Sequence, residues 1–185
     1  MYALLTILAA LAVAVTGKGK PSSITTNPSQ SGKTPAVLVS LQRLYHLPLT
    51  KNILETSQAR IKQEIAAGAT AVGPIGKVPI APDSNCQFLK PIVTFTKADG
   101  PNTNLYAIDE NSKQWALANG YTQGNTIGYA VPKWGICGAS IPVYNFYHVV
   151  VGFVQMSSME EGGSYLPPNP GGVFYPRGVG FFIWE

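Results

Sequence analysis

The chain has 185 residues, which is long enough for one domain with a hydrophobic core. Apolar residues make up 45% of it and charged residues only 12%, and with 19 glycines and 15 prolines this composition is typical of a turn-rich β domain. It does not fit a helical bundle or a disordered chain. The net charge of +4 comes from scattered basic residues, which argues against a nucleic-acid partner because such binding needs a basic stripe.

The chain opens with a mostly apolar stretch, residues 3–15, that is too short to span a bilayer. Val15 and Gly17 place small residues at the two positions that signal peptidase reads. No Lys or Arg precedes the stretch, so a buried first helix and an uncleaved membrane anchor are the alternatives. We expect residues 1–17 to be a signal peptide, and the mature protein to be secreted and free of the membrane.

Residues 18–36 are rich in Ser, Thr, Pro, Gly and Lys and show no apolar periodicity. Such a segment cannot bury enough surface to offset the entropy lost on ordering. We therefore expect a flexible leader over 18–36 and a single folded domain over 37–185.

Glycines recur at a fixed interval in this domain. Two series are spaced by 52 residues, namely Gly76, Gly128 and Gly180, and Gly68, Gly120 and Gly172. Alternating apolar segments that begin at Leu41, Ile92 and Val143 are offset by 51. Recurrence at such a period is the signature of a repeat protein, and it predicts three repeats of about 52 residues, at about 38–90, 91–141 and 142–185.

Each repeat predicts the same elements in the same order. The first gives strand 41–47, strand 53–56, a helix between the N-cap Ser57 and the C-cap Gly68, and strand 73–80. The second gives strands 92–97, 105–108 and 126–131, with a helix between Asp109 and Gly120. The third gives strands 143–149, 153–156 and 178–184, but prolines and glycines forbid a regular helix of more than one turn over 157–172.

One such unit cannot bury its apolar face alone. We therefore expect a β-rich α+β fold in which three pseudo-symmetric strand–strand–short helix–strand repeats close around a common axis, as in a trefoil or a propeller. Two sets of residues share a repeat position: Leu44, Phe95 and Phe146, which we expect to fill the core, and Leu54, Tyr106 and Val154.

The repeats resemble a family of tandem repeats of unknown function, which occurs in secreted bacterial and fungal proteins, often beside glycoside hydrolase or peptidase domains. The family's pattern is roughly Y-R-F-Y-N, then H-F-Y-T-T-S, a short helix ending in glycine, and E-G-I-A-F. Matching segments are 42–46 and 144–148 for the first element, 52–57 and 104–109 for the second, and 177–181 for the last. The resemblance covers about residues 38–185 and implies a secreted accessory module without naming a ligand.

Two polar positions of the family differ in this chain. The histidine of the pattern is replaced by Asn52, Asn104 and Gly152, and the glutamate by Gly73, Asn125 and Arg177. Any work that the family performs with these two side chains is therefore lost or changed here.

The sequence carries no sign of a catalytic or metal centre. Its two histidines, His46 and His148, occupy equivalent repeat positions, whereas a metal site needs three or four ligands and the third equivalent position holds Lys97, a cation. There is no G-x-S-x-G motif and no pair of carboxylates placed for glycoside hydrolysis. We expect no enzyme activity, no cofactor and no metal.

Cys86 and Cys137 lie 51 residues apart at matching repeat positions. In a secreted chain they predict a disulfide that links adjacent repeats, and the chain-entropy estimate for a loop of this length is ~4 kcal/mol. Two buried free thiols are the alternative.

Aromatic side chains are the remaining candidates for a binding site, because sugars stack their C–H faces on Trp and Tyr rings while amides bind the hydroxyls. Trp134, in the loop before Cys137, would form a stacking platform if it is exposed. The other candidate ligand-binding residues, at or opposite the strand ends, are Tyr45, Tyr147, His46, His148, Asn52 and Asn104. Core or hairpin packing is the alternative for each of them, and Trp115, on the second helix, is expected in the core.

These observations favour a secreted, non-catalytic binding module with a lectin-like site for carbohydrate or cell-wall polysaccharide. The second hypothesis is a secreted protein-binding, structural or effector protein that uses the irregular segment 159–172. A small hydrolase is the third.

Overall fold

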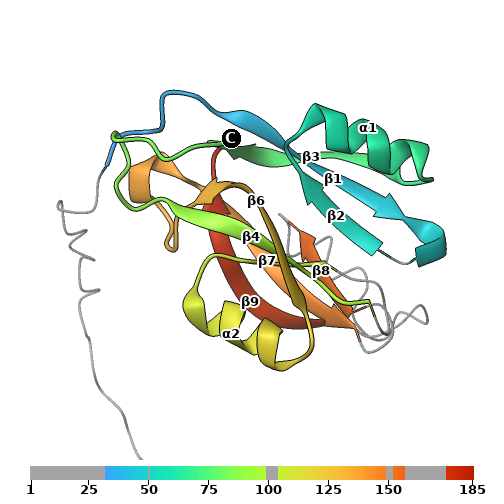
Figure 1. Cartoon of the computed structure of the whole chain (residues 1–185). Coiled ribbons are helices and arrows are strands. Elements are labelled where there is room, and N and C mark those ends of the chain that lie inside the picture. Colours follow the sequence, from blue (N-terminus) through green and yellow to red (C-terminus); the bar gives the residue numbers. More distant parts are fainter. Residues whose placement is uncertain (1–31, 50, 99–103, 149–151, 157–173) are drawn as a thin grey trace, which may run out of the picture.

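The computed structural model describes residues 32–49, 51–98, 104–148, 152–156 and 174–185. Its described strands form three antiparallel sheets of three strands each, so the protein is β-rich, as the composition predicts (Figure 1). The strands are β1 (Val39–His46), β2 (Lys51–Glu55) and β3 (Thr70–Val78) in the first sheet, β4 (Lys90–Thr96), β5 (Asn104–Ala107) and β6 (Thr122–Ala130) in the second, and β7 (Ile141–His148), β8 (Gly152–Met156) and β9 (Phe174–Ile183) in the third.

All three sheets have the same topology. The strand that comes first along the chain lies in the centre, with the second strand on one side and the third on the other, in the orders β2-β1-β3, β5-β4-β6 and β8-β7-β9. Each central strand pairs in continuous register with the second strand, but its pairing with the third strand contains two register shifts. The strands appear in the predicted order and begin up to four residues earlier than predicted.

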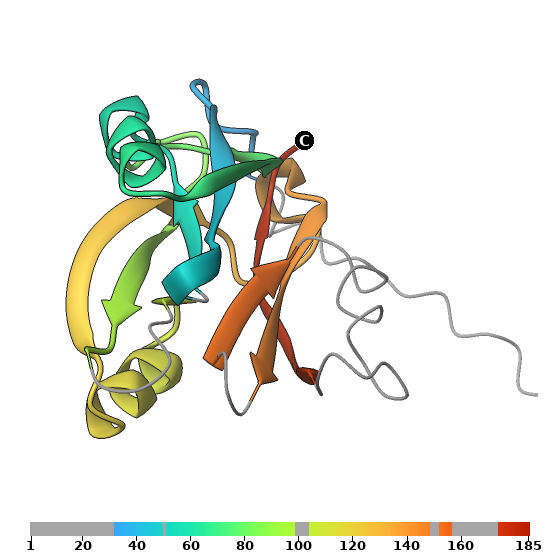
Figure 2. The same cartoon turned by 90° about the vertical axis from the view of Figure 1, so that its right-hand side faces the viewer.

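Two α-helices follow the second strands, α1 (Gln58–Ala66) and α2 (Glu110–Ala118), as predicted. The predicted caps are confirmed: the Ser57 hydroxyl accepts from Arg60 N, and Asp109 Oδ1 accepts from Ser112 N at 2.8 Å. Gly68 and Gly120 follow the helices with φ of 103° and 80°, a left-handed conformation that favours glycine. Figure 2 shows both helices on the outside of the molecule. Two short 3₁₀ turns, η2 (Leu47–Leu49) and η3 (Ile136–Gly138), complete the described helices.

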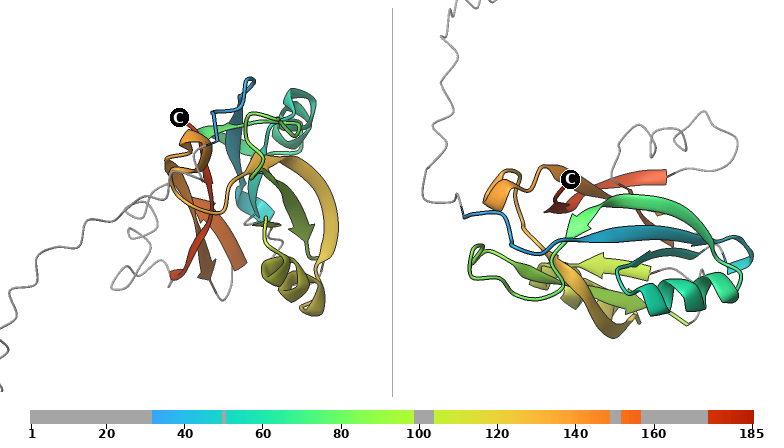
Figure 3. Two further views of the ribbon diagram at one scale, coloured as in Figure 1. Left: turned by 90° about the vertical axis from the view of Figure 1, so that its left-hand side faces the viewer. Right: turned by 90° about the horizontal axis from the view of Figure 1, so that it is seen from above.

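The three sheets are joined by backbone hydrogen bonds near the ends of their third strands. In each case a residue of one third strand bonds to a residue just beyond another third strand: Lys77 of β3 to Trp184, Phe182 of β9 to Val131, and Tyr129 of β6 to Pro79. The end of β9 therefore joins β3, the end of β6 joins β9, and the end of β3 joins β6. The second strands β2, β5 and β8 also contact one another in pairs. The view from above in Figure 3 shows the C-terminus beside β3.

These joints explain two members of the glycine series. A Cβ atom on Gly76 would lie 2.8 Å from the carbonyl oxygen of Trp184, and one on Gly128 would lie 2.7 Å from Cγ2 of Val78 and 3.2 Å from the carbonyl oxygen of Pro79. The end of another sheet thus passes too close to the third strand for any side chain. Close approach of a neighbouring sheet, chiefly by the Trp184 backbone at Gly76 and by the Val78 side chain at Gly128, is the physical reason for glycine at these two positions.

The central core draws on all three sheets. The central strands contribute Leu41, Ile92 and Val143, all fully buried. The set expected to fill the core, Leu44, Phe95 and Phe146, is also fully buried. Leu44 and Phe95, however, lie in separate clusters that include residues of α1 and α2. Leu44 therefore packs between α1 and the first sheet, and Phe95 packs between α2 and the second sheet.

The alignment of the third repeat is corrected by one residue in its second strand. Val154 pairs with the phenylalanine of the central strand, as Leu105 does in the second sheet. Gln155, and not Val154, therefore occupies the position of Tyr106. Its side chain is fully buried, so this position brings a polar group into the interior.

The predicted disulfide is confirmed between Cys86 and Cys137, whose Cα atoms are 5.8 Å apart. It joins the segment before β4 to η3, and both cysteines belong to the central core. A disulfide is consistent with an extracellular protein. No helix in the described part of the chain is long and apolar enough to cross a membrane.

Part of the segment expected to be a leader lies against the loop that carries Cys86. Lys33 N donates to the carbonyl oxygen of Asn85 at 2.9 Å, and Ala36 N donates to Oδ2 of Asp83 at 2.7 Å. Asp83 also accepts from Asn85 N through its other oxygen, so one carboxylate binds backbone N–H groups of both segments in this contact. The predicted signal peptide, residues 1–17, lies outside the described residues.

Candidate ligand-binding site

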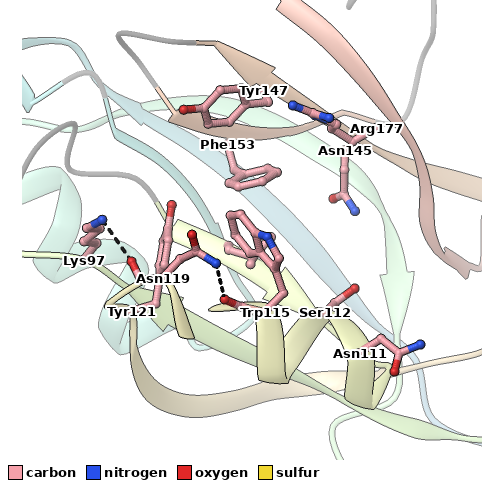
Figure 4. A pocket seen from close by; sticks show the side chains of 11 residues that line it. Lys97, Asn111, Ser112, Trp115, Asn119, Tyr121, Asn145, Tyr147, Phe153 and Arg177 are labelled. Carbon is pink, nitrogen blue, oxygen red and sulfur yellow. Dashed lines mark hydrogen bonds between the residues drawn. The ribbon is translucent and has the colours of Figure 1, made fainter. Parts of the chain in front are cut away.

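An open cavity of about 640 Å³ lies between the second and third sheets, beside α2. The helix and its flanks form one wall, and strands of the third sheet form the other (Figure 4). The lining residues are Lys97, Leu105, Asn111, Ser112, Trp115, Asn119, Tyr121, Asn145, Tyr147, Phe153 and Arg177. The volume is within the range of roughly 300–1,000 Å³ that is usual for small-molecule sites.

Four aromatic rings form the centre of this cavity. Trp115 meets Phe153 edge-on with 5.4 Å between ring centroids, and Tyr121 lies at 6.1 Å on its other side. Phe153 in turn contacts Tyr147 at 5.2 Å. Phe153 and Tyr121 are buried, whereas 44% of Trp115 is exposed. The indole is therefore held in place by its neighbours and presents free surface to the cavity.

Amide and hydroxyl groups surround the rings. Asn111 and Ser112 lie in the first turn of α2, and Asn119 lies at its end, where its Nδ2 donates to the Trp115 carbonyl oxygen at 2.8 Å. Asn145 faces them from β7, and its Oδ1 accepts from Nε2 of Gln155 at 3.2 Å. That bond fixes the side chain and leaves its Nδ2 as a donor for a bound molecule.

Two cations lie at opposite sides of the aromatic cluster (Figure 4). Lys97 Nζ donates to the Asn119 carbonyl oxygen at 2.9 Å and lies 5.7 Å from the ring centroid of Tyr121. The guanidinium of Arg177 lies over Tyr147, with Cζ 5.5 Å from the ring centroid. No Asp or Glu is among the described lining residues, so the walls of the cavity carry positive charge.

The corresponding place between the first and second sheets is smaller, about 440 Å³, and lies between the start of α1 and β6. When the Asn125 amide on β6 is oriented with its oxygen toward Arg60 of α1, that oxygen accepts from Nη1 of the guanidinium at 3.0 Å. Ser112 and Arg177 stand 52 residues further on. Between the first and second sheets, the arginine therefore lies on the helix (Arg60) and the shorter side chain on the strand (Asn125). Between the second and third sheets the order is reversed, with Arg177 on the strand and the hydroxyl group of Ser112 on the helix.

The residues chosen from the sequence at strand ends lie in different surroundings. His46 is buried, and its Nε2 lies 2.8 Å from the Ala67 carbonyl oxygen at the end of α1. Lys97 makes the equivalent contact to the end of α2. Asn52 and Asn104 are buried, with 2% and 5% of their surface exposed. His46 and Lys97 thus contact the ends of the helices, and Asn52 and Asn104 lie in the interior.

The remaining candidates divide between the cavity and the surface. Tyr147 lines the cavity, and Tyr45 lies opposite Asn52 in the first sheet. Trp134 is 69% exposed, in the loop before η3, and does not line the cavity. His148 ends β7, and its side chain lies outside the described residues, as does the segment 159–172.

Trp115 is the residue that the sequence analysis missed, because it was expected in the core. A signal for its exposure is present in the sequence. The equivalent residue of α1 is Gln63, a polar side chain, and the neighbouring Ala116 is the residue of α2 that faces inward and is fully buried. Adjacent residues of a helix point in directions about 100° apart, so a helix that buries Ala116 at the centre of its inner face turns Trp115 toward the edge of that face.

No cluster of three or more His, Cys, Asp or Glu side chains that could hold a metal ion occurs among the described residues. Comparisons with protein-family models, with characterised proteins and with solved structures found no match. The functional interpretation therefore depends on the cavity beside α2.

Proposed function

We propose that the chain is a secreted, non-catalytic carbohydrate-binding protein whose site is the cavity beside α2. The observation that carries this proposal is the exposed indole of Trp115, which contacts the rings of Tyr121 and Phe153 and is surrounded by Asn111, Asn119 and Asn145. Sugars need both kinds of group, an aromatic face for their C–H surface and amides for their hydroxyls. The described walls offer these groups and no carboxylate pair of the kind that glycoside hydrolysis uses.

The proposal includes three repeats that close around a common axis. The cyclic joints between the third strands, and the pairwise contacts among β2, β5 and β8, support it. Closure would hold α2 of the second repeat against β7, β8 and β9 of the third, so the two walls of the cavity keep a fixed spacing. The resemblance to the secreted tandem-repeat family supports an accessory role outside the cell.

A glycan array that includes insoluble cell-wall polysaccharides tests the proposal. We expect saturable binding to a defined glycan by the mature protein. Trp115→Ala should weaken that binding at least about tenfold, because Trp residues at the centre of binding sites commonly contribute that much or more. Trp134→Ala is the matched control, since it removes an exposed indole outside the cavity and should leave the affinity within about a factor of two.

The variants must first be shown to fold, by circular dichroism and thermal unfolding. Absence of binding across the array by folded wild-type protein would refute carbohydrate binding. Loss of binding in Trp134→Ala alone would place the site at the loop before η3 and would refute the cavity as the site.

A further inference from the structure

The geometry points to an acidic glycan as the ligand of the cavity, with a negatively charged substituent of the sugar bound by Arg177. This inference rests on the proposed function and adds the chemical class of the ligand to it. The substituent is a carboxylate or a sulfate ester, since both present coplanar or forked oxygens to a guanidinium.

Arg177 has an available guanidinium. It is exposed on β9 and forms no salt bridge within the described part of the chain. The ring of Tyr147 lies beneath it, with 5.5 Å between Cζ and the ring centroid, and so limits the directions that the guanidinium can take. Stacking on a ring leaves the N–H groups at the edge of the guanidinium plane free to donate. An Arg held in this way is well suited to bidentate binding of an anion.

The charges around the cavity favour one place for the anion. Two acidic groups, Asp109 and Glu110, precede the lining residues of α2 along the chain, and the Asp109 carboxylate caps the helix by accepting from Ser112 N. Glu110 is paired with Lys113 at 2.8 Å. The start of α2 is therefore already occupied by negative charge. Lys97 is engaged with the end of α2, so Arg177 is the cation that remains for a ligand.

The interface between the first and second sheets has its arginine, Arg60, on the helix instead of on the third strand. Arg60 is there bound to Asn125, and the space beside it is the smaller cavity. With Ser112 in place of that arginine, the second interface is open and its cation faces the aromatic cluster. The difference between the two interfaces coincides with the exchange of an arginine bound to an amide for one that forms no salt bridge with any described residue.

The test compares two pairs of polysaccharides, each with a charged and a neutral member on the same sugar backbone: polygalacturonate with its methyl ester, and dextran sulfate with dextran. We expect the wild-type protein to bind at least one charged member roughly tenfold more tightly than its neutral partner, as hydrogen bonds to charged groups generally allow. Arg177→Gln should abolish this preference while keeping the weaker binding of the neutral form. Lys62→Gln is the control, because it removes the same charge from an exposed position of α1 that lines neither cavity.

Which pair shows the preference identifies the substituent as a carboxylate or a sulfate ester. Equal binding of charged and neutral forms by the wild type would overturn the inference, as would an equal loss in Arg177→Gln and Lys62→Gln. In either case the proposed function stands if Trp115→Ala still weakens binding on the array. Failure of Trp115→Ala to weaken binding would instead refute the cavity itself.

Discussion

Tyr106 places a hydroxyl group in the centre of the molecule. The side chain is 1% exposed, and its oxygen accepts from Leu54 N at 2.7 Å and from Nδ2 of Asn104 at 3.1 Å. Leu54 belongs to the first sheet and Tyr106 to the second, so this bond couples two sheets through a buried polar contact. Burial raises the pKa of the Tyr106 hydroxyl well above its ordinary value, because the phenolate cannot be solvated there.

Tyr106→Phe should lower the free energy of unfolding by about 2 kcal/mol, because two buried donors lose their acceptor. The effect should depend on pH. Unfolded tyrosine loses its proton above about pH 10 while the buried group keeps it, so the stability that Tyr106 contributes is complete below that pH and falls above it. Urea unfolding of both proteins between pH 7 and 11, taken here as rough limits, measures this. A difference between the two proteins that does not shrink at high pH would contradict the interpretation.

Single residues were harder to predict than elements. His46, Asn52 and Asn104 recur at strand ends, and the sequence analysis took them as candidates for a ligand, but each is buried. A residue type that recurs at one repeat position can serve the fold as readily as a site, and His46 and Lys97 show this by making the same contact to a helix end. Only Tyr147 among the candidates is a described lining residue of the cavity.

At the scale of the elements, the two helices begin with unequal caps. Asp109 Oδ1 accepts from Ser112 N at 2.8 Å, whereas Ser57 Oγ accepts from Arg60 N at 3.4 Å. The start of α1 has additional help, since Oε1 of Glu55 accepts from the backbone N–H of Ser57 at 2.9 Å. Burial alone would raise the pKa of Asp109, but the hydrogen bonds from Ser112 and neighbouring backbone groups outweigh it and lower that pKa.

Asp109→Ala should therefore cost about 1 kcal/mol of stability, and Ser57→Ala less. The contribution of Asp109 is present at neutral pH, and it should disappear as the pH falls below about 4, because protonation removes the charge that the cap uses. Chemical unfolding of both variants and the wild type at pH 7 and at roughly pH 3 checks the order and its loss. An equal cost for the two alanine variants would show that the shorter bond contributes no extra stability.

The bounds of the helices and second strands lie within two residues of the predicted positions, because their caps and turns are local. The third strands deviate more, since β3, β6 and β9 begin three to four residues before the predicted positions. β3 contains Gly73, Pro74 and Gly76, and its exposed first residues show no alternation of apolar and polar side chains. Each register shift interrupts the alternation of inward- and outward-facing side chains along the strand. Alternation in the sequence therefore predicts only the part of such a strand that enters the core.

At the scale of the whole molecule, the sequence predicts the three groups of strands better than the way in which their sheets are joined. The joints between sheets are backbone hydrogen bonds, which any residue can form, and they leave a trace only where the approach is too close for a Cβ atom, at Gly76 and Gly128. The cavity beside α2 lies between the second and third sheets, so no single sheet contains it. Its aromatic and cationic residues are separated in the sequence and become neighbours only when the sheets assemble.

If the three sheets close around a common axis, the contact between Lys77 of β3 and Trp184 should be essential for stability, although Trp184 is the second-last residue of the sequence. Trp184 is 3% exposed, exchanges two backbone hydrogen bonds with Lys77 of β3, and donates from Nε1 to the Cys137 carbonyl oxygen at 2.8 Å. Deletion of residues 184–185 should lower the free energy of unfolding by about 3–5 kcal/mol, as expected for loss of a buried Trp. It should also separate the unfolding of the first sheet from the rest, because in an open chain each repeat depends only on its neighbours.

Deletion of Glu185 alone is the control, since this residue is exposed and its side chain makes a single 3.4 Å contact, with Ser140 Oγ. Thermal unfolding followed by far-ultraviolet circular dichroism and by tryptophan fluorescence should coincide in the wild type and in the control, and diverge in the protein that lacks Trp184. Coincident transitions with unchanged stability in that protein would mean that the joint between β3 and the end of β9 does not close the molecule. The cavity would then be held by contacts between the second and third sheets alone.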